Sequence, residues 1–493
     1  MHGSNRVARP RPKMFCVAWL HRWTGVAFCL LFVVWFASGL VLVFVPFPAL
    51  NPPQRWSAAE PIDLRRLAVT PAQALRQLRD ATTLRLVSIG GRPGYVVGNA
   101  TTTSTVDGID GRARGMLSAE TAGAIAAAFG HARVRQLDGP LTYDQWVVHQ
   151  KFDPWRPLYR AALDDERGTV LYVSARTGEV VQRTRANERA WNWVGSIPHW
   201  LYFTQLRRSF TAWDRTVWWL ALAALCSASA GTLLGVYRTW QRMRSPKPAW
   251  SGFRGWMRWH HGLGLVAAVF VLGWIFSGWL SMDHGRLFSR GIPEPAQVAR
   301  YSGAPLHVAF ANVDAAALRC LSGATQIDFT AVGSRPIAVA RGPAGTAVSD
   351  GVAGRITGAR LSPTVIRQAA ARVWTLEPVP AAPDSGEALY RQADAIAADA
   401  VRLTVASPTR TALYFDPASG APLLALDASR RTYAWLYLAM HTTNFPLLRS
   451  LPLIRRSVQI VPLLLGLAFS LTGVVLGTRR LLLSLRKIGS AVP

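Results

Sequence analysis

The stretch VAFCLLFVVWFASGLVLVFV, residues 26–45, contains no charged side chain. A helix needs about 20 successive apolar residues to cross the hydrocarbon core of a bilayer, so this stretch predicts a membrane-spanning helix. Three further uncharged, mostly apolar stretches of similar length lie at 217–237, 262–282 and 458–478. The sequence therefore predicts an α-helical membrane protein with four transmembrane helices.

The amino-acid composition supports this prediction. Of the 493 residues, 50% are hydrophobic and 17% are charged, whereas a soluble protein usually has about a quarter charged residues. The net charge of +28 would also be typical of a nucleic-acid-binding protein. The positions of the charges along the chain distinguish that class from a membrane protein. The four cysteines form no CxxC pattern, which argues against a thiol redox pair and against covalent c-type haem.

Positive charges are concentrated beside the ends of the predicted spans. Residues 1–22, 238–258 and 479–487 together hold fifteen Lys and Arg and no Asp or Glu. These three flanks share one side of a four-span topology, and short positive loops stay in the cytoplasm. We therefore predict a multi-pass protein of the bacterial inner membrane with both termini in the cytoplasm. Nucleic acid is not needed to explain the charge, and the lipid bilayer is the expected partner.

The predicted layout alternates spans with two long outer regions. It consists of a cytoplasmic N-terminus (1–13), transmembrane helices (14–45, 213–238, 258–282 and 457–479), periplasmic domains (46–212 and 283–456), a cytoplasmic loop (239–257) and a cytoplasmic tail (480–493). The outer regions show helix patterns at 71–80, 119–129 and 364–373, strand patterns at 84–89 and 95–97, and hairpins that turn at Gly178 and Gly420. Both outer regions are therefore predicted to be α+β domains.

Two registers relate the first half of the chain to the second. A shift of 239 residues maps His21 onto His260 and Ser38-Gly39 onto Ser277-Gly278. A shift of 242 residues maps His199 onto His441 and Gly231 onto Gly473. We therefore predict two tandem repeats of span, outer domain and span, related by an axis along the membrane normal.

Four of the ten histidines follow these registers. His21 and His260 lie at the cytoplasmic ends of the first and third spans, whereas His199 and His441 precede the second and fourth spans at the outer surface. An ionisable side chain in or beside a span is costly in lipid, so it predicts a functional site. Two bis-histidine sites fit b-type haem, whose iron takes axial histidines from facing helices. The sequence predicts two haems with these four histidines as iron ligands.

Alternatives remain at single positions. His261 could ligate in place of His260, because adjacent residues point about 100° apart on a helix. A lone histidine at the interface is more often a helix-end residue than a ligand. Basic residues near the histidines could pair with haem propionates: Arg22, Arg207 and Arg449.

The remaining histidines carry weaker signals. His149 has no counterpart at the later register, where Arg391 stands, and it could have a substrate or surface role. His284 and His307 are interpreted as loop residues. The sequence assigns no catalytic acid or base.

Several motifs extend over nearly the whole chain. They are WLHRWTG (19–25) with SG (38–39), HHGLG (260–264) with SG (277–278), RPLYR (156–160), YVSARTG (172–178), IPHW (197–200) and MHTTNF (440–445). In these motifs the chain resembles bacterial inner-membrane proteins with PepSY-associated transmembrane helices, a family that includes iron-regulated membrane proteins and ferrisiderophore reductases. The chain departs from this pattern in its second outer region, where an alanine-rich stretch lies at 393–400.

The resemblance implies PepSY-like α+β modules outside and a transmembrane part that holds haem through His21, His260, His199 and His441. It also implies electron entry from an unidentified donor in the cytoplasm or membrane, and exit to a ferric chelate in the periplasm. The leading hypothesis is therefore a haem oxidoreductase that acts on an acceptor such as a ferric siderophore. The main alternative is a non-enzymatic, membrane-anchored PepSY module that binds or regulates a periplasmic partner related to peptidases or transport. A solute permease ranks third.

Overall fold

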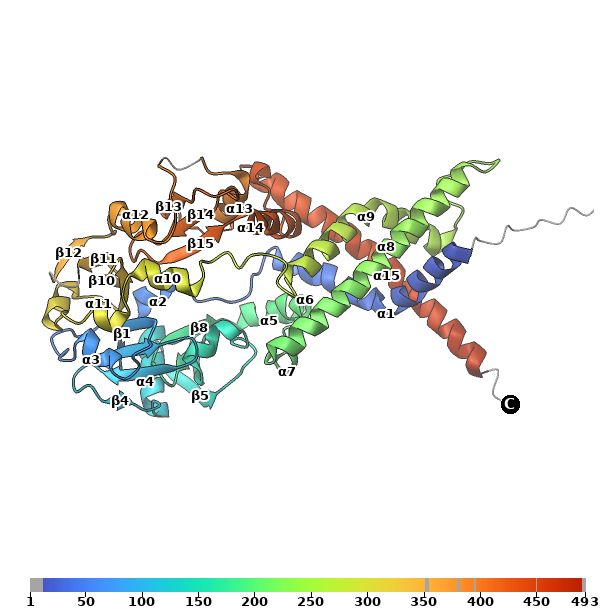
Figure 1. Ribbon diagram of the computed structural model, residues 1–493. Helices are drawn as coiled ribbons and strands as arrows, with labels where there is room; N and C mark the ends of the chain where they lie inside the picture. The colour runs from blue at the N-terminus through green and yellow to red at the C-terminus, as the bar shows by residue number, and fades with distance from the viewer. Residues whose placement is uncertain (1–11, 351–353, 379–381, 394–395, 449, 490–493) are drawn as a thin grey trace, which may run out of the picture. The chain divides into compact units, whose positions relative to one another are not determined.

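The structure is a computed structural model that describes residues 12–350, 354–378, 382–393, 396–448 and 450–489. The chain divides into two compact units. The helical unit comprises the described residues of 1–46, 191–287 and 433–493, and the sheet unit comprises those of 47–190 and 288–432. Each predicted outer region therefore lies mostly in the sheet unit, while the predicted spans lie in the helical unit (Figure 1).

The helical unit contains four helices that are long and apolar enough to cross a membrane. They are α1 (Pro12–Leu42), α8 (Phe210–Met243), α9 (Gly255–Ser281) and α15 (Pro452–Gly489). Each predicted apolar stretch lies largely within one of them, so the prediction of four apolar helices is confirmed. Helix α8 continues into the basic flank through Arg238 and Arg242, because a helix need not end where its apolar run ends.

The four helices form a bundle in which α1 contacts α8 and α15, and α9 contacts the same two helices. Phe36, Ala224, Ala267, Val271 and Ile275 are buried at its centre. Short elements precede α8 and α15. They are α5 (Ala186–Val194), α6 (Ser196–Trp200), α7 (Thr204–Arg207), α14 (Ala428–Tyr433), the π-helix η3 (Ala434–His441) and the 3₁₀-helix η4 (Pro446–Leu448). Of these, α6 contacts α1 and η3 contacts α9.

The sheet unit is organised around an antiparallel eight-stranded sheet with the order β12-β11-β10-β9-β1-β2-β3-β4. The strands are β1 (Thr83–Ile89), β2 (Arg92–Gly98), β3 (Thr103–Asp107), β4 (Ala113–Arg114), β9 (Gln326–Val332), β10 (Arg335–Gly342), β11 (Gly345–Asp350) and β12 (Arg355–Gly358). Strands β1 and β9 pair through registers such as Leu84 with Phe329. The two predicted outer regions thus share one sheet, which strand patterns along the sequence do not reveal.

Two smaller antiparallel sheets complete this unit. One contains β5 (Val134–Leu141), β6 (Leu158–Leu163), β7 (Val170–Ser174) and β8 (Val180–Thr184), and the other contains β13 (Val401–Thr404), β14 (Ala412–Phe415) and β15 (Pro422–Leu426). The remaining elements are α2 (Pro52–Ala58), α3 (Pro71–Leu75), α4 (Ala119–Gly130), α10 (Pro295–Ser302), α11 (Leu306–Ala309), α12 (Pro363–Ala371), α13 (Ser385–Gln392), η1 (Gln150–Trp155) and η2 (Ala316–Leu321). Helix α4 packs on β5, β6 and β7.

Local sequence signals correspond to these elements with shifted ends. The helix expected over 71–80 is shorter, because α3 ends at Leu75, although Thr70 and Gln73 form a capping box at its start. Both predicted hairpin turns contain a glycine with positive φ, +70° at Gly178 and +68° at Gly420. A side chain is strained in that conformation, which explains why glycine marks both turns.

Candidate functional site

Two histidines on the apolar helices face each other. The rings of His21 on α1 and His260 on α9 have centres 6.3 Å apart and planes tilted by 32°. Nδ1 of His21 lies 3.0 Å from the carbonyl oxygen of Ser227 on α8, and Nδ1 of His260 lies 2.9 Å from Oγ1 of Thr472 on α15. We call His21 and His260 the span pair. A neighbouring helix holds each of its rings.

The hydrogen-bond partners fix the protonation of the span pair. A carbonyl oxygen only accepts, so Nδ1 of His21 donates to Ser227. The Thr472 hydroxyl donates to the carbonyl oxygen of Phe469 at 2.6 Å, so it accepts from Nδ1 of His260. Neutral imidazoles in this arrangement carry their proton on Nδ1 and keep the Nε2 lone pair. Within the described residues, neither Nε2 atom has a hydrogen-bond partner.

The other two register-related histidines are His199 on α6 and His441 at the end of η3, which we call the connector pair. Nδ1 of His199 lies 3.0 Å from Oγ of Ser38 on α1, and Nδ1 of His441 lies 3.1 Å from Oγ of Ser277 on α9. Both hydroxyls donate to the carbonyl oxygen three residues earlier, so they accept from the imidazoles. Their neutral forms again keep the Nε2 lone pair.

A glycine lies against each of the four rings. The contacts pair His21 with Gly231, His260 with Gly473, His199 with Gly39 and His441 with Gly278. A Cβ atom at Gly231 would collide with the ring of His21, whereas one at Gly473 would lie 3.7 Å from Cε1 of His260. Small residues let helix backbones come close to a ring. The registers of 239 and 242 residues that relate the histidines also relate these glycines.

A cavity of about 560 Å³ lies beside the span pair. This volume is typical of a site for a small molecule or cofactor, which usually occupies about 300–1,000 Å³. Its wall contains both imidazoles of the pair, several glycines and four arginines, namely Arg22, Arg238, Arg479 and Arg480. The cavity thus combines an apolar lining with two imidazoles and four cations, which suit an anionic molecule.

The two pairs lie toward opposite ends of the bundle. His21 and Ser38, the contact of His199, are both on α1 and lie about 25 Å apart at about 1.5 Å per residue. In the part of the chain that the structure describes, three or more His, Cys, Asp or Glu side chains nowhere converge as a metal site. Each pair can therefore supply two nitrogen ligands, which suits a metal whose other ligands belong to a cofactor.

A family model described as the PepSY-associated TM region matches residues 18–480. The chain belongs to this family. A search of the curated proteins gives no match. Family membership, together with four apolar helices, identifies this PepSY-associated protein as a membrane protein and confirms the family resemblance seen in the sequence.

The structure separates the two adjacent histidines of this PepSY-associated chain. His260 faces His21, whereas both nitrogens of His261 are already hydrogen-bonded. Nδ1 of His261 lies 2.9 Å from Oγ of Ser251, and its Nε2 lies 3.1 Å from Oγ1 of Thr239. His261 is buried and stacks on Trp250. This geometry favours His260 as the residue with a nitrogen available to the cavity.

The three arginines named from the sequence have different surroundings. Arg22 is exposed and lines the cavity beside the span pair. Arg207 is buried among aromatic rings at the end of α7. Arg449 lies outside the described residues. The arginines at 22 and 207 therefore cannot serve one common site, since they lie beside different histidine pairs.

Two further histidines differ in their contacts. His149 caps the 3₁₀-helix η1 by accepting from the backbone N–H of Lys151 at 2.9 Å, which is a structural role. His284 is more than a loop residue, since its Nδ1 lies 2.6 Å from Oδ2 of the buried Asp214. Sequence reasoning missed this pair. Asp214 is the only acid in the predicted span 213–238, and a lone charge there indicates a partner.

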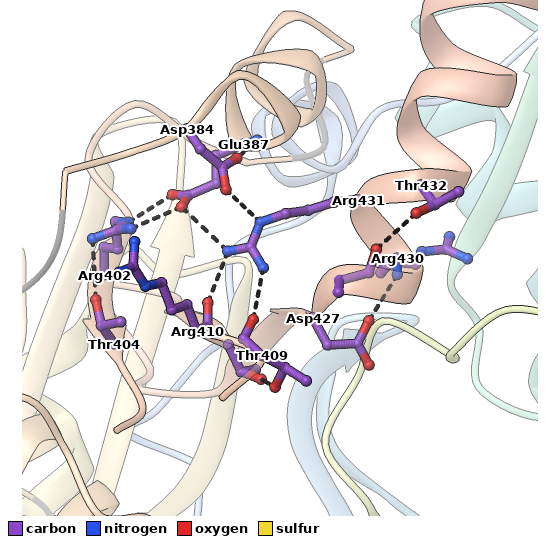
Figure 2. A network of polar contacts seen from close by, with 12 residues as sticks. Asp384, Glu387, Arg402, Thr404, Thr409, Arg410, Asp427, Arg430, Arg431 and Thr432 are labelled. Atoms are coloured by element: carbon purple, nitrogen blue, oxygen red, sulfur yellow. Dashed lines mark hydrogen bonds and ion pairs between the residues drawn. The ribbon is translucent and has the colours of Figure 1, made fainter. Parts of the chain in front are cut away.

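A buried carboxylate anchors α14, the helix that leads into η3. Glu387 is 1% exposed and binds Arg402 through two hydrogen bonds of 2.6 and 2.7 Å (Figure 2). The Tyr414 hydroxyl also donates to Glu387. Arg431 of α14 lies 3.7 Å from Glu387 and 2.5 Å from Asp384. The network thus joins Arg431 of α14 to α13 and to strand β13 within the sheet unit.

The first half of the chain contains a weaker version of this network. The 242 register relates Arg402, Tyr414 and Arg431 to Arg160, Tyr172 and Arg189. The Tyr172 hydroxyl donates to Asp144 at 2.7 Å, but Nε of Arg160 lies 4.0 Å from the same carboxylate. Arg189 of α5 donates to the carbonyl oxygen of Gly168 at 3.0 Å, as Arg431 donates to that of Arg410 at 2.9 Å. Helices α5 and α14 therefore each carry an arginine that donates to a backbone carbonyl oxygen of the sheet unit.

Proposed function

We propose that this chain is a b-type haem oxidoreductase of the bacterial inner membrane, which relays electrons across the bilayer to a periplasmic acceptor such as a ferric siderophore. One observation supports the proposal most strongly. All four register-related imidazoles are held through Nδ1 by a neighbouring helix, and all four keep the Nε2 lone pair. Metal-bound histidines commonly show this arrangement, because the second nitrogen donates to a fixed oxygen.

His21 and His260 would hold the iron of one haem as its two protein ligands. An imidazole nitrogen lies about 2 Å from a first-row metal and the ring centre about 1 Å beyond it, so two rings on opposite sides of one metal have centres about 6 Å apart. The rings of His21 and His260 have centres 6.3 Å apart. When bound, haem supplies a one-electron Fe(III)/Fe(II) couple. The arginines at the cavity, including Arg22 and Arg238, suit its carboxylates.

The connector pair supports a second haem. His199 and His441 make equivalent hydrogen bonds of 3.0 and 3.1 Å to serines that the 239 register relates. We propose accordingly that the chain consists of two tandem parallel repeats. With the basic flanks at 1–22, 238–258 and 479–487 in the cytoplasm, the span pair lies near that side. The connector pair and the two PepSY-like outer regions then lie on the periplasmic side.

A visible spectrum and a haem assay test the proposal. The purified protein should show a sharp α band after reduction with dithionite, and a pyridine haemochrome assay should give b-type haem at about two per chain. In proteoliposomes with reductant inside and a ferric chelate outside, Fe(II) should form outside only when the protein is present. A colourless protein refutes the proposal and favours the alternative, a membrane-anchored PepSY module that binds a periplasmic partner.

A further inference from the structure

Arg207 lies in a cage of aromatic rings at the end of α7. Its side chain is the largest of the fully buried ones among the described residues, with an exposed fraction of 1%. The guanidinium carbon lies 4.3 Å from the ring centre of Trp213, 4.9 Å from that of Tyr202 and 5.6 Å from that of Phe210. We call Arg207 and these three rings the arginine cage.

The rings leave the edge of the guanidinium without acceptors. Aromatic faces attract the cation, but hydrogen bonds from its N–H groups require oxygen or nitrogen acceptors. Nε and Nη1 of Arg207 are buried and have no hydrogen-bond partner among the described residues. Buried charges are normally paired and buried donors normally bonded, because desolvation is costly otherwise. The cage therefore lacks an anionic acceptor.

The helical unit itself offers almost no anion. Its sequence contains no Asp or Glu in 1–46 or 433–493 and only Asp214 and Asp283 in 191–287. Asp214 lies 2.6 Å from His284. Among the residues that the structure describes, Arg207 takes part in no ion pair. The missing acceptor is therefore best supplied by a bound molecule.

The cage adjoins the connector pair. Trp200, which follows His199, accepts a 2.7 Å hydrogen bond at its carbonyl oxygen from Nε1 of the cage residue Trp213. Through Trp200, the cage is therefore joined to the residue next to His199.

We propose that Arg207 binds a carboxylate of the tetrapyrrole held by the connector pair, and so fixes how that cofactor is rotated about the axis through His199 and His441. This inference rests on the proposed function. Arginine suits the role because its fork of N–H groups binds a carboxylate through two parallel hydrogen bonds. The rings of Tyr202 and Trp213 hold the fork in place and exclude water that would compete for it.

The three rings of the cage have no aromatic counterparts at the 242 register. The 242 register places Asn444, Pro452 and Arg455 where the first half has Tyr202, Phe210 and Trp213. Arg449, the counterpart of Arg207, lies outside the described residues. The rings that surround Arg207 are therefore not repeated at this register, and they would hold one edge of the cofactor.

The test compares two haems that differ only in their carboxylates. The full chain with His21→Ala and His260→Ala keeps the connector pair as the site that is measured. Its apoprotein is titrated with protohaem, which has free carboxylates, and with protohaem dimethyl ester, in which they are masked, and Soret absorbance is recorded. We expect protohaem to bind about tenfold more tightly or better, because a charge-assisted bidentate pair is lost with the ester.

Variants assign this preference to Arg207. In the same background, Arg207→Leu should bind both haems with the weaker affinity of the ester, while Arg208→Leu removes an equal charge at an exposed neighbour and should keep the preference. Equal affinity for both haems before any change at Arg207 overturns the inference even if Arg207→Leu does not fold. A phospholipid that co-purifies only when Arg207 is present, without an ester effect, overturns it in favour of a phosphate ligand. If the unaltered chain binds no haem, the proposed function fails instead.

Discussion

The span pair and the connector pair present their imidazoles in the same chemical state but on different kinds of structure. His21 and His260 lie within long helices, so the packing of the bundle alone positions them. His199 and His441 lie on short elements, α6 and η3, which follow α5 and α14. The geometry of the span pair therefore depends on the packing of the long helices. The geometry of the connector pair depends in addition on the short elements α6 and η3.

If the chain binds two haems as proposed, the largest expected effect is the loss of one haem per chain when one histidine of a pair is removed. His21→Ala should remove the haem of the span pair and leave that of the connector pair, and His199→Ala should do the reverse. A pyridine haemochrome assay should therefore give about one haem per chain for either variant and none for the combination. His261→Ala is the matched control, because both of its nitrogens already bond Ser251 and Thr239. Loss of both haems from one substitution would show that the pairs are not independent.

The next largest effect should come from a substitution at Glu387, far from the histidines. Glu387→Gln keeps the side-chain volume but leaves Arg402 and Arg431 without their buried carboxylate. Breaking a buried ion pair costs about 3–5 kcal/mol, so calorimetry of the full chain should show a lower unfolding temperature. Because Arg402 and Arg431 both lie beside Glu387, the lower temperature should appear in the unfolding of the sheet unit. Asp144→Asn should cost less, since Arg160 is 4.0 Å from that carboxylate.

The difference in unfolding temperature between the unaltered chain and Glu387→Gln should depend on pH in a definite direction. Burial opposes ionisation of Glu387, but hydrogen bonds from Arg402 and Tyr414 outweigh it and lower its pKa from 4.5. A lowered pKa in the folded state means that the stabilisation is present above pH 4.5 and is lost as the pH falls through the lower, folded value. The gap in unfolding temperature between the unaltered chain and Glu387→Gln should therefore shrink as acid is added. A gap that grows in acid would contradict this assignment.

Much of the helical unit could be predicted from the sequence. Uncharged runs such as 26–45 identify the spans, because only apolar residues are stable in hydrocarbon. The registers of 239 and 242 residues select His21, His199, His260 and His441 without any structure. The 242 register also relates Arg431 to Arg189, and both side chains donate a hydrogen bond to a backbone carbonyl oxygen. This similarity was present in the sequence but was not used to predict a contact.

The rest depends on contacts between distant segments. The shared sheet requires β1 to pair with β9, about 240 residues later, and strand patterns do not name their partners. The difference between His260 and His261 depends on helix rotation, and the structure shows that Thr239 and Ser251 bond the two nitrogens of His261. The arginine cage was also beyond the sequence, because the rings that surround Arg207 show no spacing that marks a site.

At the span pair, alanine substitutions at Gly231 and Gly473 should have different effects on haem binding, although the 242 register relates the two glycines. A Cβ at Gly231 would collide with the ring of His21, whereas one at Gly473 would make only an ordinary contact with His260. Overpacking costs about 1–3 kcal/mol, so Gly231→Ala should weaken haem binding at this pair by roughly ten- to a hundredfold. Haem titrations should show little change for Gly473→Ala. Gly273→Ala on α9 is the control, because Gly273 does not line the cavity and its added Cβ would make only an ordinary contact, 3.9 Å from Sδ of Met440.

The smallest effect tests whether the connector histidines are equivalent. Ser38→Ala and Ser277→Ala each remove a hydroxyl that accepts from Nδ1, at 3.0 and 3.1 Å. Partners of this kind contribute about tenfold to metal affinity and make the imidazole more basic, which favours Fe(III). Either variant should therefore bind haem about tenfold more weakly and show a higher midpoint potential in redox titrations. Ser281→Ala is the control, because its hydroxyl donates to Gly278 and bonds no histidine. If only one of the two serine variants changed the haem affinity and midpoint potential, His199 and His441 would differ in how they bind the iron. The two halves of the chain would then differ at the iron ligands as well as at the arginine cage.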